Sequence, residues 1–295
     1  MSLFTGSGVA LVTPFIGEEV NYPVLKELIE FHIENKTDAI IVFGTTGESA
    51  TLSMEENKEI VRFAAQVSNG RIPIIAGSGN NNTSASLELS VYAQQVGANA
   101  LLLITPYYNK PTQRGMIAHF TAIANAVSIP VVLYNVPSRT GVNLLPETVA
   151  ELAKVANIQA VKEASGDISQ IAKVIELCPK DFIVYSGNDD QTIAILALGG
   201  KGVISVTANI IPFTVHQQVI GYLNGNKKIV EEALHTRELH QIMFIESNPA
   251  PVKHALNLMG IAVGECRLPL VSLENKNALE LKRVLQKYHL LGVSR

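Results

Sequence analysis

Short apolar runs rich in β-branched residues recur along this chain at a spacing of about thirty residues, which is the length of one strand–helix unit. Amphipathic segments of helical pattern lie between these runs. We interpret the runs as eight strands, at residues 8–15, 39–45, 73–78, 100–106, 131–136, 158–164, 182–186 and 202–207. Strands that are each followed by a helix predict an α/β fold, a (β/α)8 TIM barrel, with a doubly wound open sheet as the alternative.

Signals for helix starts support this alternation. Ser53 precedes the acidic pair Glu55-Glu56, Thr83 precedes a long helical pattern, and Pro146 stands at a first turn. Hydroxyl side chains favour the capping position, and proline favours the first turn. The helices that we expect between the strands include 22–35, 54–67, 84–96, 112–126, 146–154 and 168–176.

The strand pattern stops after Asn224-Gly225-Asn226. Helical stretches follow at 228–244, 252–259 and 278–289. We therefore expect a barrel domain at residues 1–224 that carries the active site, and a small C-terminal helical domain at residues 225–295.

Composition and spacing exclude several classes of protein. Lys and Arg number 23 against 26 Asp and Glu, without a dense basic cluster, so a nucleic-acid partner is not expected. Neither a signal peptide nor a membrane-spanning run is present, and Cys178 and Cys266 stand alone, so we expect a cytoplasmic protein. His235 and His240 miss the spacing of zinc ligands on one helix face, and 77–82 lacks the third glycine of the dinucleotide fingerprint. We expect neither a metal nor another cofactor.

Lys162 lies within the largely apolar run Ile158 to Ser165, which we interpret as the sixth strand. Burial disfavours the charged form of a lysine, and the neutral amine is a nucleophile that can form an imine with a carbonyl substrate. A lysine can instead lay its stem on apolar surface and keep its ammonium in water. The choice between these interpretations depends on what surrounds Lys162.

In a (β/α)8 barrel the chemistry collects where the strands end, and several polar groups stand at these positions. Tyr134 closes the strand beside that of Lys162 and could shuttle protons, or its hydroxyl could simply be satisfied in the barrel wall. Residues 44–47 offer hydroxyls and amides to a small carboxylate, although a tight turn is the alternative. Arg139 could clamp a second carboxylate or form a surface ion pair.

Three segments carry a family resemblance: Gly44-Thr45-Thr46-Gly47-Glu48-Ser49, Tyr134-Asn135-Val136-Pro137-Ser138-Arg139-Thr140-Gly141 and Lys162-Glu163-Ala164-Ser165-Gly166-Asp167. Together they resemble the signatures of the dihydrodipicolinate synthase family, which belongs with N-acetylneuraminate lyase among the pyruvate-dependent class I aldolases. The resemblance runs from Gly8 to the segment Asn248-Pro249-Ala250-Pro251-Val252-Lys253 and so covers nearly the whole chain.

The resemblance implies the catalytic roles. Lys162 would form the imine with pyruvate, and Tyr134 would donate and accept protons. Thr45 and Tyr108 would complete a proton relay, with Tyr108 reaching into the site of a neighbouring subunit. Members of this family are commonly homotetramers built as dimers of dimers, so we expect a homotetramer here.

The resemblance also implies the substrates and the residues that bind them. Thr46 and the backbone of Ile204 would bind pyruvate. Gly187, at the end of the seventh strand, is a further residue that we expect to bind substrate. Arg139 would bind the carboxylate of L-aspartate 4-semialdehyde, and the product would be 4-hydroxy-tetrahydrodipicolinate on the route to diaminopimelate and lysine. Two alternatives remain open, a sugar-acid aldolase with the same imine chemistry and an idle barrel that senses a small acid.

One departure from the family pattern concerns regulation. Feedback-inhibited relatives bind lysine between subunits through histidines and a glutamate, whereas the matching positions here are Met54, Asn57 and Ala85. Loss of a carboxylate that pairs with the lysine amine weakens binding. The sequence therefore predicts weak or absent inhibition by lysine.

Overall fold

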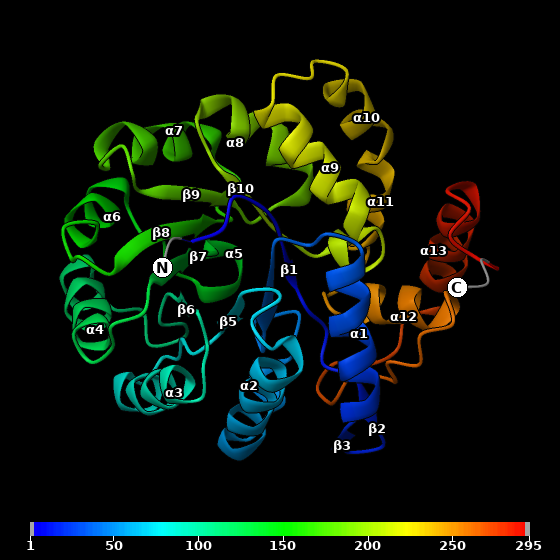
Figure 1. The fold of residues 1–295 in the computed structure, drawn as a ribbon, viewed down its shortest axis with the longest axis horizontal. Helices are drawn as coiled ribbons and strands as arrows, with labels where there is room; N and C mark the ends of the chain where they lie inside the picture. The colour runs from blue at the N-terminus through cyan, green and yellow to red at the C-terminus, as the bar shows by residue number, and fades with distance from the viewer. Residues whose placement is uncertain (1–2, 293–295) are drawn as a thin grey trace.

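The computed structural model describes residues 3–292, and within this range eight parallel strands close into a barrel in the order β1-β10-β9-β8-β7-β6-β5-β4 (Figure 1). The prediction of a (β/α)8 barrel is confirmed. The barrel strands are β1 (Gly6–Ala10), β4 (Ala39–Val42), β5 (Ile74–Ala76), β6 (Ala100–Ile104), β7 (Val131–Asn135), β8 (Ile158–Glu163), β9 (Ile183–Ser186) and β10 (Gly202–Ser205).

Helices surround this barrel, and further helices lie to one side of it (Figure 1). The helices that follow the strands are α1 (Tyr22–Glu34), α2 (Met54–Ser68), α3 (Thr83–Gln95), α4 (Gln113–Asn125), α5 (Pro137–Thr140), α6 (Pro146–Leu152), α7 (Ile168–Leu177), α8 (Thr192–Leu198) and α9 (Pro212–Leu223). The C-terminal helices are α10 (Ile229–His235), α11 (Arg237–Ile242), α12 (Ala250–Leu258) and α13 (Asn275–Lys287). Residues 1–2 and 293–295 of the two expected domains lie outside the described residues.

Side chains alternate between two apolar cores along each strand, as the period of a strand requires. On β8, Ala160 belongs to the core inside the barrel, whereas Val161 belongs to the core between the barrel and its helices. Lys162 has the same parity as Ala160 and the inward-facing Ala164. The alternation therefore directs Lys162 into the barrel, near the end of its strand.

The first strand differs from its prediction. We expected it at 8–15, but β1 ends at Ala10, and Phe15 begins a small hairpin of β2 (Phe15–Ile16) with β3 (Glu19–Val20). The cause is tertiary, because the Phe15 amide donates to the carbonyl of Val263 in the C-terminal region at 3.0 Å. The hairpin thus connects the N-terminal part of the barrel to the C-terminal region.

Two smaller predictions were also wrong. The helix expected at 228–244 is divided at Thr236, whose hydroxyl donates to the carbonyl of Ala233 at 3.1 Å, a local bond that competes with helix geometry. The long helix α3 is capped by Asn82 instead of Thr83, with the Asn82 side chain accepting from the amide of Ser84 at 2.9 Å. Ser53, by contrast, caps α2 as predicted and closes a capping box with Glu56.

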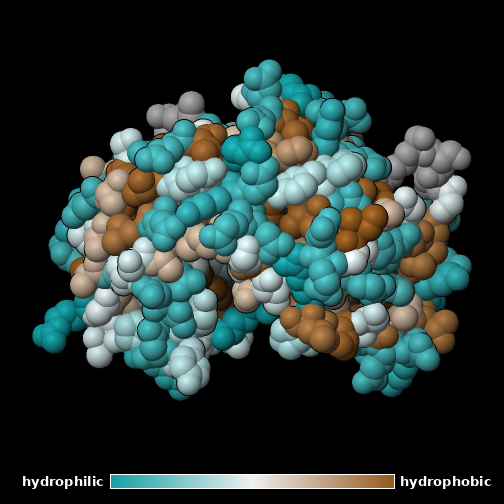
Figure 2. Space-filling model, turned by 90° about the horizontal axis from the view of Figure 1, so that it is seen from below, coloured by the Kyte–Doolittle hydropathy of each residue, from teal (hydrophilic) through white to brown (hydrophobic). Residues whose placement is uncertain are grey.

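The surface mixes hydrophilic side chains with apolar patches (Figure 2). The exposed large apolar side chains include Tyr108, Leu268 and Leu279. Among the described residues, no helix has both the length and the apolar character needed to cross a membrane.

Candidate active site

A cavity of about 200 Å³ lies at the end of the barrel where the strands terminate. Its walls come from the loop after β4, from β7 and β8, from the ends of β9 and β10, and from the C-terminal region. Six of the eight predicted site residues line it: Thr45, Thr46, Tyr134, Arg139, Lys162 and Gly187. The barrel therefore brings together residues that are up to 142 positions apart, from Thr45 to Gly187.

Lys162 and Tyr134 stand side by side in this cavity. They are Cα partners in the parallel pair β7–β8, and Lys162 Nζ lies 4.3 Å from the centroid of the Tyr134 ring. Lys162 is 5% exposed and Tyr134 is 6% exposed, so the amine is not in bulk water. This burial contradicts the interpretation of Lys162 as a strand-end lysine whose ammonium is hydrated.

The residues that follow these two side chains fix the strand ends from the opposite face. The side-chain amide of Asn135 donates to both oxygens of Glu163, at 3.1 and 3.2 Å. The backbone amide of Ser165 donates to Glu163 Oε1 at 2.8 Å. Burial raises the pKa of the Glu163 carboxyl, although hydrogen bonds from Ser165, Asn135 and Gln170 oppose the shift. These contacts stabilise the register in which Tyr134 faces Lys162.

The loop from Gly44 to Gly47 forms the next part of the wall and is tightly enclosed. A Cβ at Gly47 would lie 2.8 Å from Phe43 Cα, and the hydroxyl of Thr13 donates to the Gly47 carbonyl at 2.7 Å. Thr46 Oγ1 accepts a hydrogen bond from the side-chain amide of Asn248 at 2.9 Å. Because that bond occupies a lone pair, the Thr46 hydroxyl proton remains available to a ligand in the cavity.

Arg139 lies on α5 at the edge of the cavity. It also lines a second cavity of about 640 Å³, and both cavities share Thr45, Arg139 and Asn248. The guanidinium is exposed and donates to the Asn248 carbonyl at 3.4 Å, so most of its donors are available to an anion. An arginine in this position can bind a carboxylate in bidentate fashion.

The structure does not bring the remaining two predicted residues into this cavity. Tyr108 is 88% exposed and projects from the chain to which it belongs. The Ile204 side chain is buried in the core inside the barrel, so only its backbone could meet a ligand. Both placements agree with the roles that the resemblance implies, a contribution to a neighbouring subunit and a backbone contact, but they do not test them.

Sequence reasoning missed Asn248 as a site residue. Asn248 lines the cavity and contacts Thr46 with its side chain and Arg139 with its carbonyl. It belongs to the Asn248 to Lys253 segment that carried part of the resemblance, so the signal was present without an assigned role. Within residues 3–292, no group of three or more His, Cys, Asp or Glu side chains is placed to hold a metal ion.

Comparisons with known proteins agree on one family. The model of the "Dihydrodipicolinate synthetase family" matches residues 3–288. The 4-hydroxy-tetrahydrodipicolinate synthase of Thermoanaerobacter sp. (strain X514) is 56% identical over 293 residues, which cover 99% of each chain.

Solved structures show the same likeness. The crystal structure of dihydrodipicolinate synthase from Aquifex aeolicus superimposes with a TM-score of 0.96 at 44% identity, covering 98% of this chain and 100% of that one. A structure described as the first monomeric dihydrodipicolinate synthase variant has a TM-score of 0.96 at 43% identity and covers 98% of both chains.

Proposed function

This chain belongs to the dihydrodipicolinate synthetase family of aldolase-type lyases, and we propose that it condenses pyruvate with L-aspartate 4-semialdehyde to give 4-hydroxy-tetrahydrodipicolinate, in lysine and diaminopimelate biosynthesis. The observation that carries the proposal is the buried Lys162 amine 4.3 Å from the Tyr134 ring, in a cavity with Arg139 at its edge. The name of the Thermoanaerobacter relative supports the choice of substrates.

Lys162 is the nucleophile in this proposal. Its neutral amine attacks the ketone carbon of pyruvate, and the resulting carbinolamine loses one water to form an imine. Removal of a methyl proton gives an enamine, whose carbon attacks the aldehyde carbon of the semialdehyde. The semialdehyde's own amine then displaces Lys162 from the imine carbon and closes the ring, so that the net reaction joins the two substrates and releases one water.

Tyr134 moves the protons that these steps require. Its ring stands beside Lys162, and its hydroxyl can protonate the departing water and later accept a proton. Thr45 lines the same cavity and continues the relay, which Tyr108 of a neighbouring subunit completes. The exposure of Tyr108 supports this assignment, because a side chain that acts in another subunit must project from its own.

The carboxylates of the two substrates bind at different places. Pyruvate's carboxylate accepts from the Thr46 hydroxyl, and Gly187 and the Ile204 backbone contribute to substrate binding in the same cavity. Arg139 binds the carboxylate of the semialdehyde at the cavity edge. This arginine favours an amino-acid aldehyde over the neutral hydroxyl chain of a sugar.

We further propose that the enzyme is a cytoplasmic homotetramer, divided into a barrel domain at 1–224 and a helical domain at 225–295. Cys178 and Cys266 are unpaired, as is usual in a reducing compartment. Lysine would inhibit weakly or not at all. Met54, Asn57 and Ala85 line the larger cavity without a carboxylate, and the Glu48 carboxylate there is already paired with Lys253. An inhibition constant in the sub-millimolar range would contradict the proposal on lysine.

Borohydride reduction in the presence of pyruvate, followed by peptide mass analysis, tests the central step. We expect one pyruvyl adduct, on Lys162. Lys253 is the internal control, because it is 1% exposed but held in an ion pair with Glu48, and it should stay unmodified. The absence of an adduct on Lys162 would rule out the imine mechanism.

A direct assay separates the synthase from its rivals. Pyruvate is supplied with aspartate semialdehyde, with N-acetylmannosamine or with glyceraldehyde, and product formation is compared at equal enzyme concentration. We expect turnover with the semialdehyde to exceed the other two by orders of magnitude. Preference for a sugar aldehyde would identify the chain as a sugar-acid aldolase. If none of the three aldehydes is turned over, the chain would instead be a barrel that binds a small acid without catalysis.

A further inference from the structure

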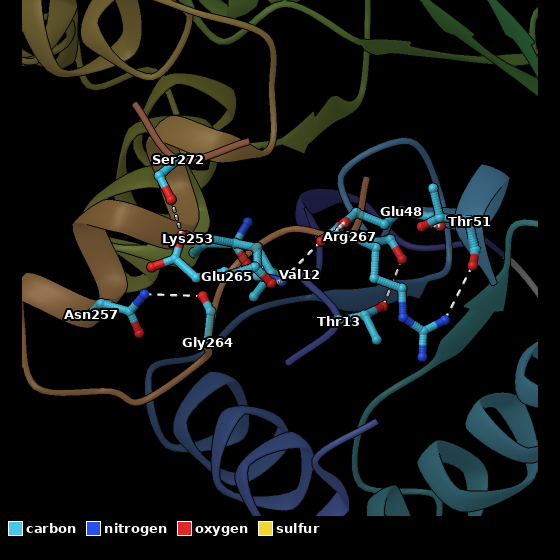
Figure 3. Close-up of polar contacts among 12 residues, drawn as sticks. Val12, Thr13, Glu48, Thr51, Lys253, Asn257, Gly264, Glu265, Arg267 and Ser272 are labelled. Atoms are coloured by element: carbon cyan, nitrogen blue, oxygen red, sulfur yellow. Dashed lines mark hydrogen bonds and ion pairs between the residues drawn. The ribbon is translucent and has the colours of Figure 1, made fainter. Parts of the chain in front are cut away.

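Lys253 of α12 is a buried lysine that the proposed chemistry does not use. Its ammonium donates to Glu48 Oε1 at 2.8 Å and to the carbonyl of Glu265 at 2.7 Å (Figure 3). It also lies 4.3 Å from the centroid of the Phe15 ring. Lys253 and Glu48 side chains are 2% and 0% exposed. A lysine from the C-terminal region thus neutralises a carboxylate on the loop that follows β4.

The C-terminal region satisfies both oxygens of that carboxylate. Glu48 Oε2 accepts from the backbone amide of Arg267 at 2.9 Å, and the Arg267 side chain extends to the Thr51 carbonyl at 3.1 Å (Figure 3). The loop that carries Glu48 is therefore anchored to residues more than 200 positions away in the chain. Local sequence contacts alone would not hold it in this way.

The backbone of the loop needs such an anchor. Glu48 has φ 57° and ψ 36°, and Phe43 at the other end of the loop has φ 38°. Residues other than glycine rarely adopt these left-handed conformations, and they persist where the surrounding structure determines them. The two strained residues enclose Thr45 and Thr46, which line the cavity.

Glu48 is also linked directly to the threonines. Its backbone amide donates to the Thr45 carbonyl at 3.1 Å. Asn248, two residues before α12 begins, donates to the Thr46 hydroxyl at 2.9 Å. The same C-terminal segment therefore contacts the loop at two points, at Thr46 and at Glu48, which stand on either side of Gly47.

We propose that Glu48 and Lys253 are positioning residues, and that their buried ion pair holds the loop so that the Thr45 and Thr46 hydroxyls meet pyruvate. The C-terminal helices are then part of the active site. A buried ion pair contributes little net stability, because the cost of desolvation offsets much of the attraction. An apolar pair of similar volume often gives the same free energy of unfolding. What the ion pair adds here is a defined position for the backbone of Glu48. This inference rests on the function proposed above.

The double variant Glu48→Gln/Lys253→Met tests the proposal, because it removes both charges and leaves neither buried alone. We expect it to melt near the wild-type temperature while its KM for pyruvate rises about 10- to 100-fold, since a displacement of about 1 Å can cost that much. The KM for the aldehyde should change less than the KM for pyruvate. A folded double variant with wild-type KM for pyruvate would overturn the proposal.

The single variant Glu48→Gln keeps the test decisive if the double variant does not fold. Lys253 and the Arg267 amide bind different oxygens of Glu48, and glutamine has an NH2 group in place of one of them, so that group must face one of the two donors. We expect the KM for pyruvate to rise in this variant as well, and Lys253→Arg, which keeps the charge, to retain more activity than Lys253→Met. An unchanged KM in Glu48→Gln would contradict the positioning role.

The matched control is Glu56→Gln. Glu56 pairs with Arg267 at 2.6 Å and so joins the barrel to the same C-terminal region, but Glu56 lies on α2 and not on the loop that carries Thr45 and Thr46. Glutamine can still close the capping box with Ser53. This variant should lose some thermal stability without a change in KM for pyruvate. An equal rise in KM in the control would show that the effect is general loosening.

Borohydride trapping distinguishes failure of this inference from failure of the proposed function. If the wild type forms no adduct with pyruvate at Lys162, the proposed function fails. If the wild type and the double variant trap pyruvate with the same concentration dependence, the function stands and the positioning role fails. We expect half-maximal trapping in the double variant to need about 10- to 100-fold more pyruvate, matching its KM.

Discussion

Tyr134 and Lys162 are Cα partners in adjacent parallel strands, and the Lys162 amine lies 4.3 Å from the centre of the Tyr134 ring. The pairing belongs to the strand ladder, so its geometry is set by the same backbone register that closes the barrel. Sites built on strands hold their side chains more firmly than sites on loops. The two side chains that we propose as nucleophile and proton donor are therefore held in place by the strand ladder itself.

Replacing Tyr134 with phenylalanine should preserve the fold and slow turnover. The ring stays in place, while the hydroxyl that we propose as the proton donor is removed, and a positioned acid–base group contributes about 10²- to 10⁴-fold. Steady-state kinetics should show this loss mainly in kcat. A variant with near wild-type kcat would assign the proton transfers to another group.

Tyr185→Phe is the matched control for this experiment. Tyr185 is the Cα partner of Lys162 on the other side, in β9, but its hydroxyl donates to the Phe4 carbonyl at 2.5 Å instead of reaching the cavity. Loss of that bond should lower the free energy of unfolding by about 0.5–1.5 kcal/mol and leave kcat close to wild type.

Arg139→Lys should weaken binding of the aldehyde substrate. Lysine keeps the charge but loses the planar fork that binds a carboxylate bidentately. Hydrogen bonds to charged groups are worth about 1.5–3 kcal/mol, so the KM for aspartate semialdehyde should rise about 10- to 100-fold. Arg114→Lys, on the exposed side of α4, is the control and should leave the KM for aspartate semialdehyde unchanged. An unaffected KM in Arg139→Lys would remove this residue from substrate recognition.

Activity should be restored when Tyr108→Phe and Lys162→Ala subunits are combined in one assembly. Each variant alone is expected to be nearly inactive. In a mixed dimer the site that keeps Lys162 receives an intact Tyr108 from the other subunit, because Tyr108 projects from its own chain. Turnover per mixed dimer should approach half that of the wild type. No recovery in co-expressed, co-purified mixtures would mean that Tyr108 acts within its own chain or not at all.

Much of the fold follows from the sequence because barrel strands are buried on both faces. Runs such as Ala100–Ile104 and Val131–Asn135 read as continuous apolar segments, which are distinct from the amphipathic helices between them. Lys162 was found by the same contrast, as a charge in an apolar strand. The ends of strands, such as that of β1 at Ala10, could not be predicted in the same way, because a residue continues the strand only if a neighbouring strand in space pairs with it.

The contribution of the C-terminal region could not be predicted from local pattern. The contacts of Asn248 with Thr46 and of Lys253 with Glu48 join residues separated by 202 and 205 positions. No periodicity in either segment indicates them, because they depend on how α12 packs against the barrel. Only the complete fold shows that a loop of small polar residues is held from outside the barrel.

The stability of the protein should fall in acid as buried histidines become protonated. Burial lowers the pKa of His32 to about 3 and that of His119 to about 4, from an ordinary value of 6.5. Below pH 6.5 these histidines become protonated in the unfolded chain but stay neutral in the native state, so acid favours unfolding. Each histidine should lower the free energy of unfolding by about 1.4 kcal/mol per pH unit until its own folded pKa is reached.

Chemical denaturation of His32→Asn between pH 7 and 4 measures this effect. Asparagine does not titrate but keeps a polar atom near the Thr37 hydroxyl, which lies 2.9 Å from His32 Nδ1. The acid slope should be shallower than that of the wild type by about 1.4 kcal/mol per pH unit. The exposed His289→Asn serves as the control. Equal slopes in the wild type and His32→Asn would show that His32 does not resist protonation.

The two cysteines should resist alkylation in the native protein. Burial raises the pKa of the Cys266 thiol to about 12, with a further contribution from the Glu48 charge, and burial raises that of Cys178 to about 11. Only the thiolate reacts, and an ordinary cysteine has a pKa near 8.5, so at pH 8 Cys266 should react about a thousandfold more slowly than an exposed thiol. Iodoacetamide labelling with peptide mass analysis follows each site, and denaturant should make both react at the ordinary rate. Rapid labelling of Cys266 without denaturant would show that the contact between the C-terminal region and the Glu48 loop opens in solution.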